Sequence, residues 1–102
     1  MKINLLETKE ILDLEKEIGY ELKVNERRPD SGLHRFYVLF ENGWVMNDGM
    51  LIGSLGQGDS IDEALQDYAS KISFKQIAFN SYNNNRKEII FPKLVHTKLI
   101  NT

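Results

Sequence analysis

Two tight-turn dipeptides, Asn42-Gly43 and Asp48-Gly49, lie close together in the middle of the chain. Runs rich in aromatic and β-branched residues precede, separate and follow them. Asn-Gly and Asp-Gly favour the left-handed backbone that a two-residue turn needs, so each pair predicts a β-hairpin. A three-stranded antiparallel meander is therefore expected, with strands over 35–41, 44–47 and 50–55.

An amphipathic helix is predicted directly after this meander. The segment Gly56-Gln57-Gly58-Asp59 ends the strand pattern, and its glycines predict a tight turn with positive φ. Ser60 and Glu63 then have the spacing of a capping box. A helix over 60–72 follows from the apolar residues at helical spacing, which are Ile61, Ala64, Leu65, Tyr68, Ala69 and Ile72.

A second helix is predicted over residues 4–18. Asn4 is its expected N-cap, with Glu7 three residues later, and Gly19 is a natural left-handed stop. Its apolar face would carry Ile11, Leu14 and Ile18.

The remaining chain predicts further strands over 20–25, 75–80 and 86–91, and a final segment that frays. Strands and helices segregate, which indicates an α+β fold with an antiparallel sheet of four or five strands and a helix across one face. The expected organisation is a single domain over 1–102. Its parts are an N-terminal helix over 1–19, a sheet and helix core over 20–95, and a tail over 96–102.

Composition excludes several classes of protein. The 102-residue chain has no cysteine, which excludes disulfides, thiolate metal sites and cysteine nucleophiles. No apolar run approaches the roughly 18 residues of a membrane span, and acids recur through the first turns, unlike a signal peptide. A cytoplasmic protein without a membrane partner is expected.

Charge is distributed unevenly along the chain. Residues 36–70 contain six acids and no Lys or Arg, whereas residues 71–102 contain six bases and Glu88 as the one acid. Such a distribution can steer a charged partner, or the two segments can neutralise each other in the fold.

No motif for catalysis or for a cofactor is complete. The turn Gly56-x-Gly58 before a helix is a setting for phosphate binding, but Asp59 occupies the position where an anion would approach. His34 and His96 have no partner at metal-ligand spacing. The prediction is a protein that is not an enzyme and binds neither a metal nor a cofactor.

Aromatic and basic residues are the candidates for binding a partner. Trp44 follows a predicted turn and would either pack on the sheet or anchor a partner, since Trp, Tyr and Arg dominate interface energetics. An aromatic ring is interleaved with cations at Tyr82, Arg86 and Lys87. Such a stretch can contact phosphates and stack bases, and more often it is a solvated face that pairs with acids elsewhere.

The segment 38–72 resembles the core of HicB-type antitoxins. The resemblance rests on a β-meander followed by Gly56-Gln57-Gly58-Asp59-Ser60 and a helix with Glu63-Ala64 near its start. It implies a core of three strands, a helix and a further strand, an order also found in double-stranded-RNA-binding domains. It also implies a partner toxin and a DNA-binding segment at the C-terminus of the HicB-type chain.

A longer pattern over 36–95 resembles a set of small uncharacterised proteins of bacteria and their phages. The shared residues include Gly43-Trp44, Asn47-Asp48-Gly49-Met50-Leu51, Gly56-x-Gly58-Asp59, Asp67-Tyr68-Ala69, Phe79-Asn80-x-Tyr82 and Arg86-Lys87-Glu88-Ile89. This resemblance implies a phage or mobile-element setting, in which small proteins often bind and block a host factor.

The predicted function is a non-catalytic interaction module that occupies the surface of a host protein, such as a nuclease or defence complex. One alternative is nucleic-acid binding through the basic C-terminal third, and another is small-nucleotide binding at the turn Gly56–Ser60. An open sheet edge would also allow a homodimer. The candidate partner-binding residues are Trp44, Asn47, Asp48, Asp59, Tyr82, Arg86 and Lys87.

Overall fold

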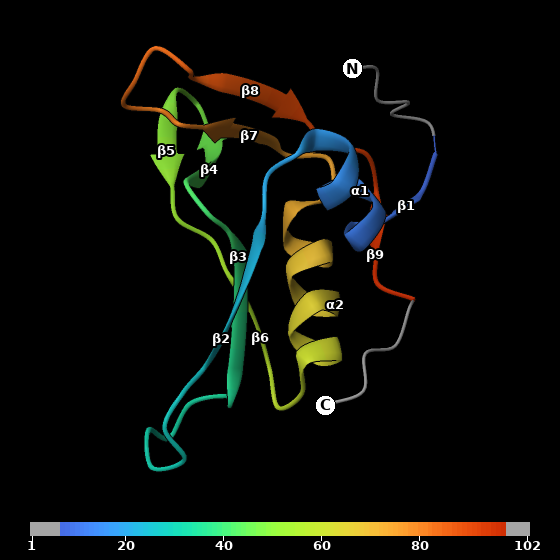
Figure 1. Ribbon diagram of the computed structural model, residues 1–102, viewed down its shortest axis with the longest axis vertical. Coiled ribbons are helices and arrows are strands. Elements are labelled where there is room, and N and C mark those ends of the chain that lie inside the picture. Colours follow the sequence, from blue (N-terminus) through green and yellow to red (C-terminus); the bar gives the residue numbers. More distant parts are fainter. Residues whose placement is uncertain (1–6, 98–102) are drawn as a thin grey trace.

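The computed structural model describes residues 7–97, and this range forms an α+β fold with two helices (Figure 1). The α+β class predicted from the sequence is confirmed. The helices are α1 (Ile11–Ile18) and α2 (Ile61–Ile72). The strands are β1 (Lys9–Glu10), β2 (Leu22–Glu26), β3 (Phe36–Phe40), β4 (Gly43–Asn47), β5 (Met50–Ile52), β6 (Gly56–Gly58), β7 (Gln76–Phe79), β8 (Lys87–Ile90) and β9 (Leu94–Val95).

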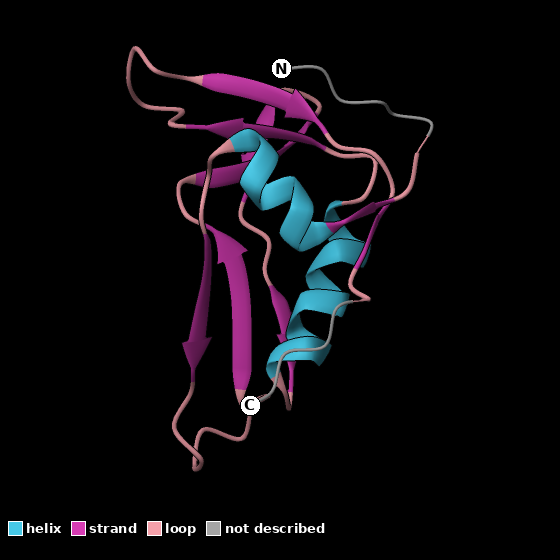
Figure 2. Ribbon diagram, turned by 45° about the vertical axis from the view of Figure 1, so that its right-hand side comes forward, coloured by secondary structure: helices cyan, strands magenta, loops and turns pink. Residues whose placement is uncertain are grey.

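The strands of the described range form two antiparallel sheets instead of the single meander sheet that the sequence predicts. The first sheet has the order β2-β3-β6 and the second has the order β5-β4-β7-β8. Figure 2 shows that the strands of the two sheets run in different directions. A parallel pair of β1 with β9 completes the strands of this range. The strands predicted over 20–25, 75–80 and 86–91 are confirmed as β2, β7 and β8.

The hairpin predicted at Asn42-Gly43 is wrong, because β3 and β4 belong to different sheets. Asn42 has a left-handed φ of 59°, but Gly43 does not, and a type I′ turn needs both. The Asn80 N–H donates to the Asn42 carbonyl at 3.2 Å, so this corner is tied to the second sheet instead.

The second tight turn forms as predicted. Asp48 and Gly49 have φ values of 52° and 80°, and they join β4 to β5 in an antiparallel hairpin. The same kind of dipeptide thus gives a hairpin at one site and a crossing between sheets at the other.

Gly56 and Gly58 lie in strand β6 and not in the predicted positive-φ turn. The strand predicted over 50–55 ends at Ile52, and β6 then pairs with β3. A Cβ added to Gly56 would lie 2.3 Å from the Ala64 carbonyl oxygen, and one added to Gly58 would lie 2.4 Å from the Glu63 Cβ. Glycine is needed here because α2 packs directly against the strand.

Helix α2 begins as the capping residues predict. The Glu63 N–H donates to the Ser60 Oγ at 3.1 Å, and the Glu63 carboxylate accepts from the Asp59 N–H at 2.8 Å. The second bond of the box therefore goes to the residue before the N-cap. The buried face of α2 is the predicted one, formed by Ala64, Leu65, Tyr68, Ala69 and Ile72.

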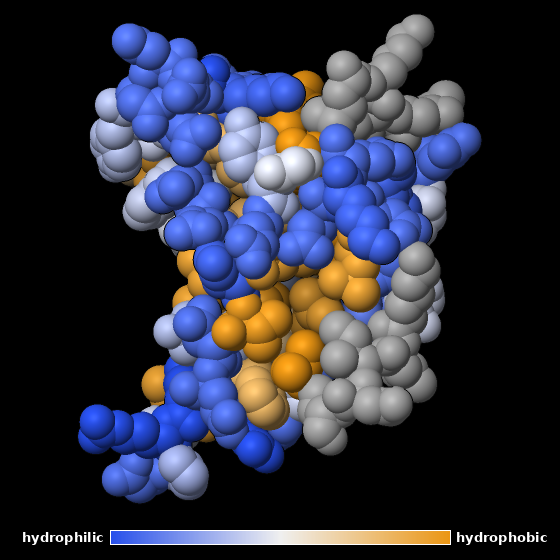
Figure 3. All heavy atoms as spheres, viewed as in Figure 1, coloured by the Kyte–Doolittle hydropathy of each residue, from blue (hydrophilic) through white to orange (hydrophobic). Residues whose placement is uncertain are grey.

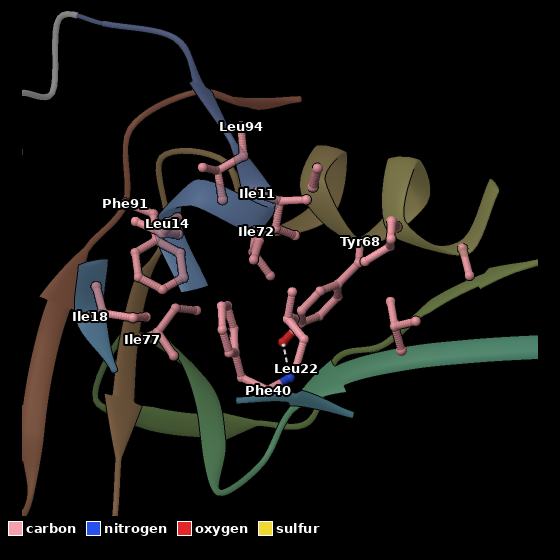
Figure 4. Packing of buried hydrophobic residues seen from close by; sticks show 14 of the residues in the cluster. Ile11, Leu14, Ile18, Leu22, Phe40, Tyr68, Ile72, Ile77, Phe91 and Leu94 are labelled. Atoms are coloured by element: carbon pink, nitrogen blue, oxygen red, sulfur yellow. Dashed lines mark hydrogen bonds between the residues drawn. The ribbon is translucent and has the colours of Figure 1, made fainter. Parts of the chain in front are cut away.

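The hydrophobic core joins both helices to both sheets (Figure 4). Phe40 lies at its centre, with ring centroids of Tyr68, Phe79 and Phe91 within 6.0 Å. The Phe40 N–H donates to the Tyr68 hydroxyl oxygen at 3.0 Å, and burial raises the pKa of Tyr68 to about 12. In Figure 3, hydrophobic residues gather between the first sheet and α2, with hydrophilic residues around them.

Both ends of the described range differ from the prediction. Helix α1 begins at Ile11 instead of residue 4, because Lys9 and Glu10 are extended and pair with β9. The predicted N-cap Asn4 lies outside the described residues. Within the predicted fraying tail, His96 is buried and the Thr97 N–H donates to the Glu10 carboxylate.

Candidate protein-interaction site

The register of the second sheet places a row of apolar side chains on one face. Met46 in β4 lies opposite Leu51 in β5 and opposite Gln76 in β7, and Gln76 lies opposite Ile90 in β8. Directly opposed residues share a face, and so do residues two apart in a strand, which adds Trp44 to this face. We call this side of the second sheet the outer face, formed by Trp44, Met46, Leu51, Gln76, Ala78, Glu88 and Ile90.

The opposite side of the second sheet contributes to the core at β7 and β8, while Ile52 of β5 on that side is 41% exposed. Ile77 and Ile89, which pair across β7 and β8, are buried in one cluster with Ile11, Leu14 and Ile18 of α1. On the outer face Ile90 is 50% exposed, and Trp44, Met46 and Leu51 are partly exposed. The outer face therefore carries partly exposed apolar side chains outside the core cluster, together with the polar pair Gln76 and Glu88 and the buried Ala78.

Trp44 is fixed on one side and accessible on the other. A Cβ added to Gly53 would lie 3.3 Å from Cζ3 of the Trp44 ring, so the ring packs over this glycine. Trp44 also lines a hollow of about 180 Å³ with Tyr82 and Ser81. Tyr82 is 85% exposed, and the buried Ser81 hydroxyl has no hydrogen-bond partner among the described residues. This hollow offers two aromatic rings to a partner, while the buried Ser81 hydroxyl is not accessible at its surface.

A basic segment borders the same end of the second sheet. Arg86 Nε lies 3.7 Å from a Glu88 carboxylate oxygen, and the other Glu88 oxygen accepts from Gln76 Nε2 at 3.2 Å. Lys87 begins β8 opposite Phe79 and forms no ion pair with any described residue.

The seven sequence-predicted binding residues separate into three places. Trp44 and Tyr82 line one hollow, Arg86 ends the β7–β8 connection that carries Tyr82, and Lys87 begins β8. Asn47 and Asp48 lie at the opposite end of β4, in the hairpin to β5. Asp59 belongs to the other sheet, before α2, where one carboxylate oxygen lies 3.3 Å from His34 Nδ1.

The turn before α2 gives no support to nucleotide binding. Atoms of α2 fill the space beside Gly56 and Gly58. The N–H groups of Asp59 and Glu63 already donate to side chains of the chain itself. A phosphate would meet the Glu63 carboxylate and the Ser60 hydroxyl instead of these amides.

Sequence reasoning missed Met46, Leu51 and Ile90 as candidates for binding. A signal was present, because apolar residues stand at consecutive positions in Trp44-Val45-Met46 and Ile89-Ile90. A strand with one face in water alternates instead. Both faces of these strands are therefore apolar, and only the register shows that one of them stays uncovered.

A second missed feature is a buried imidazole between two carboxylates. His96 Nδ1 lies 2.8 Å from a Glu10 oxygen, and His96 Nε2 lies 2.8 Å from an Asp62 oxygen. The other Glu10 oxygen accepts from the Thr97 N–H and from its hydroxyl at 2.9 Å. We call Glu10, Asp62, His96 and Thr97 the terminal clasp, because they join β1, α2 and the segment after β9.

Both ring nitrogens of His96 can donate only when the imidazole is protonated. Burial by itself lowers the pKa of His96, but the hydrogen bonds and charges of Asp62 and Glu10 outweigh it and raise the pKa above 6.5. Burial raises the pKa of Glu10, and the bonds from Thr97 and His96 reverse this and lower it below 4.5. The clasp is thus an ion-paired structural contact, invisible in the sequence because Glu10 and His96 are 86 residues apart.

Comparison with protein-family models, with curated proteins and with solved structures finds no match. The HicB-type and phage resemblances therefore stay predictions. Within residues 7–97, no helix is long and apolar enough to cross a membrane. The same range contains no group of three or more acidic or histidine side chains arranged to hold a metal ion.

Proposed function

We propose that this chain is a non-catalytic interaction module that binds a protein partner through the outer face of its second sheet. The observation that carries the proposal is the set of partly exposed apolar side chains on one face of this sheet, which are Trp44, Met46 and Leu51 on one side of the polar Gln76 and the half-exposed Ile90 on the other. An apolar surface with aromatic residues at its border is typical of a protein-binding site.

The partner is proposed to be a host factor that the bound chain blocks, such as a nuclease or a defence complex. This part of the proposal rests on the sequence resemblance to small bacterial and phage proteins over 36–95. An anchored apolar contact at Trp44 predicts that added salt changes the affinity little. If instead the acidic segment 36–70 acts as a nucleic-acid mimic, added salt should lower the affinity strongly.

A capture experiment tests the proposed function. The tagged chain is incubated with bacterial lysate, with and without nuclease, and bound proteins are identified by mass spectrometry. We expect one host protein to be retained after nuclease treatment, and purified samples of that protein to bind the chain directly. Loss of all bound material on nuclease treatment would contradict the proposal.

Nucleic-acid binding is the second candidate, favoured by the exposed Tyr82 on the same connection as Arg86. An exposed ring beside cations can stack a base while the cations contact phosphates. Under this alternative, Arg86→Ala with Lys87→Ala lowers the affinity for a single-stranded oligonucleotide and flattens its salt dependence. Fluorescence anisotropy at several salt concentrations measures both quantities.

A further inference from the structure

We infer that the open edge of β8 accepts an extended segment of the partner protein as an additional strand of the second sheet, with acidic residues of that segment beside Arg86 and Lys87. The inference rests on the proposed function, because it names the part of the partner that is bound and how its backbone is held.

Backbone groups of Glu88 and Ile90 point away from the sheet. The Phe91 N–H donates to the Lys75 carbonyl at 2.9 Å, in register with the β7–β8 ladder. Hydrogen-bonded and non-hydrogen-bonded pairs alternate along an antiparallel ladder, so Ile89 also bonds β7. The intervening Glu88 and Ile90 therefore direct their N–H and C=O groups to the open edge, with which no described strand pairs.

The other sheet edges are less available. At β2, the Leu22 N–H already donates to a Glu15 carboxylate oxygen at 2.7 Å. At β6, the Gln57 N–H already donates to an Asp67 carboxylate oxygen at 2.9 Å. Strand β5 has three residues, which leaves a shorter edge than β8. Among the described edges, β8 combines free backbone groups with partly exposed apolar side chains on the outer face.

A strand beside β8 would extend the outer face. Alternate residues of such a strand point to the same side as Ile90, whose side chain is half-exposed. Apolar residues at alternate positions of the partner segment would thus lie beside Ile90. Strand addition of this kind takes affinity from backbone bonds and specificity from alternate side chains.

Charge complementarity indicates that the partner segment is acidic at its ends. Arg86 and Lys87 stand at the start of β8, and Lys93 follows its end. Lys87 and Lys93 form no ion pair with any described residue, and Arg86 has only the long contact to Glu88. A segment with acids beside these cations and apolar residues between them fits the edge.

The probe for the test is a synthetic peptide of alternating valine and threonine with a pair of aspartates at each end. A control peptide has lysines in place of the aspartates. Titration of the isotope-labelled chain to about 2 mM peptide detects even a millimolar complex by NMR. We expect the acidic peptide to slow hydrogen exchange of the Glu88 and Ile90 amides, and the lysine peptide to bind at least about tenfold more weakly.

Two variants at one position separate backbone pairing from side-chain contact. Glu88→Pro removes the outward N–H, which β7 does not use, and an edge strand tolerates proline there. Glu88→Thr keeps the N–H and removes the same carboxylate contacts to Gln76 and Arg86. Peptide binding should fall at least about tenfold in Glu88→Pro relative to Glu88→Thr, while thermal melting confirms that both variants are folded.

Equal binding by the two folded variants, or peptide contacts that leave the Glu88 and Ile90 amides unchanged, would overturn the inference. So would the absence of any shift at the highest peptide concentration. The proposed function fails separately, when the outer-face substitutions described below leave partner capture intact. A host protein captured equally by Glu88→Pro and Glu88→Thr would leave face docking standing and reject the added strand.

Discussion

The two antiparallel sheets differ in how far their apolar side chains are buried. In the first sheet, α2 lies so close to β6 that only glycine fits at Gly56 and Gly58. In the second sheet, one face packs on α1 and the core, while the outer face keeps Ile90 half-exposed. The first sheet buries Phe36, Val38 and Phe40 and leaves only Val24 of its edge strand β2 largely exposed among the described apolar residues of its strands, whereas the second leaves Trp44, Met46, Leu51 and Ile90 at least partly exposed on one face. We interpret that face as the functional one.

The largest expected effect on stability is at Gly56 in the first sheet, compared with Gly53 beside the second sheet. Gly56→Ala places a Cβ 2.3 to 2.5 Å from backbone and Cβ atoms of α2, so it should destabilise the fold by about 3 kcal/mol or more. Gly53→Ala in the second region meets only the Trp44 ring at 3.3 Å and should cost less than about 1 kcal/mol. Urea unfolding measures both. Similar losses for the two variants would contradict the contrast between the sheets.

The second prediction concerns the bond between α2 and the first sheet. Tyr68→Phe leaves the buried Phe40 N–H without its acceptor and should cost about 1 to 3 kcal/mol. Because the folded pKa of Tyr68 is raised to about 12, its contribution is complete below pH 10 and is lost as the pH rises toward 12. Urea unfolding at neutral and alkaline pH tests this, since Tyr68→Phe should remove that part of the alkaline loss.

The third prediction concerns the terminal clasp. The raised pKa of His96 means that its contribution is complete below pH 6.5 and is lost as the pH rises through the folded value. The lowered pKa of Glu10 means that its contribution is present above pH 4.5 and is lost on further acidification. The free energy of local opening at the Thr97 amide should therefore fall by about 1 to 2 kcal/mol when the pH rises through the folded pKa of His96. It should fall by a similar amount when the pH is lowered below 4.5.

Hydrogen exchange at the Thr97 amide, followed by NMR over this pH range, measures the opening. His34→Gln is the matched control, since His34 is exposed and contacts Asp59 away from the clasp. A His96→Gln variant with unchanged Thr97 protection at pH 6 would contradict the role assigned to the clasp.

The smallest expected effect on stability is at the outer face. Ile90→Lys replaces a half-exposed side chain and should change the free energy of unfolding by no more than about 0.5 kcal/mol. Chemical denaturation checks this. A loss comparable with that of Tyr68→Phe would mean that Ile90 serves the fold instead of a partner.

Local signals in the sequence predict the elements well, and non-local pairing accounts for the errors. Ser60 and the apolar spacing predict α2 because a helix satisfies its own backbone bonds. Asn42-Gly43 misleads because Asn80, far along the chain, bonds the Asn42 carbonyl and draws that corner to the second sheet. The sequence predicts a positive-φ turn at the glycines of β6, whereas glycine is required there by the close approach of α2.

The residues of the candidate site can likewise be predicted from the sequence only in part. Trp44 and Tyr82 are found from residue type, and the structure places them on one hollow. Ile90 is found only through its register with Gln76 and Met46, which strand sequences do not contain. The terminal clasp depends on a contact across nearly the whole chain, so neither histidine spacing nor a motif could reveal it.

Binding through the outer face is tested by comparing partner capture by Ile90→Lys with capture by Leu33→Lys. Both side chains are apolar and exposed, but Leu33 lies on the connection between β2 and β3 of the first sheet. In nuclease-treated lysate, the account predicts that Ile90→Lys retains at least about tenfold less of the partner than the unchanged chain, and that Leu33→Lys retains all of it. Equal retention by the two variants, or loss confined to Leu33→Lys, would contradict the assignment of function to the outer face.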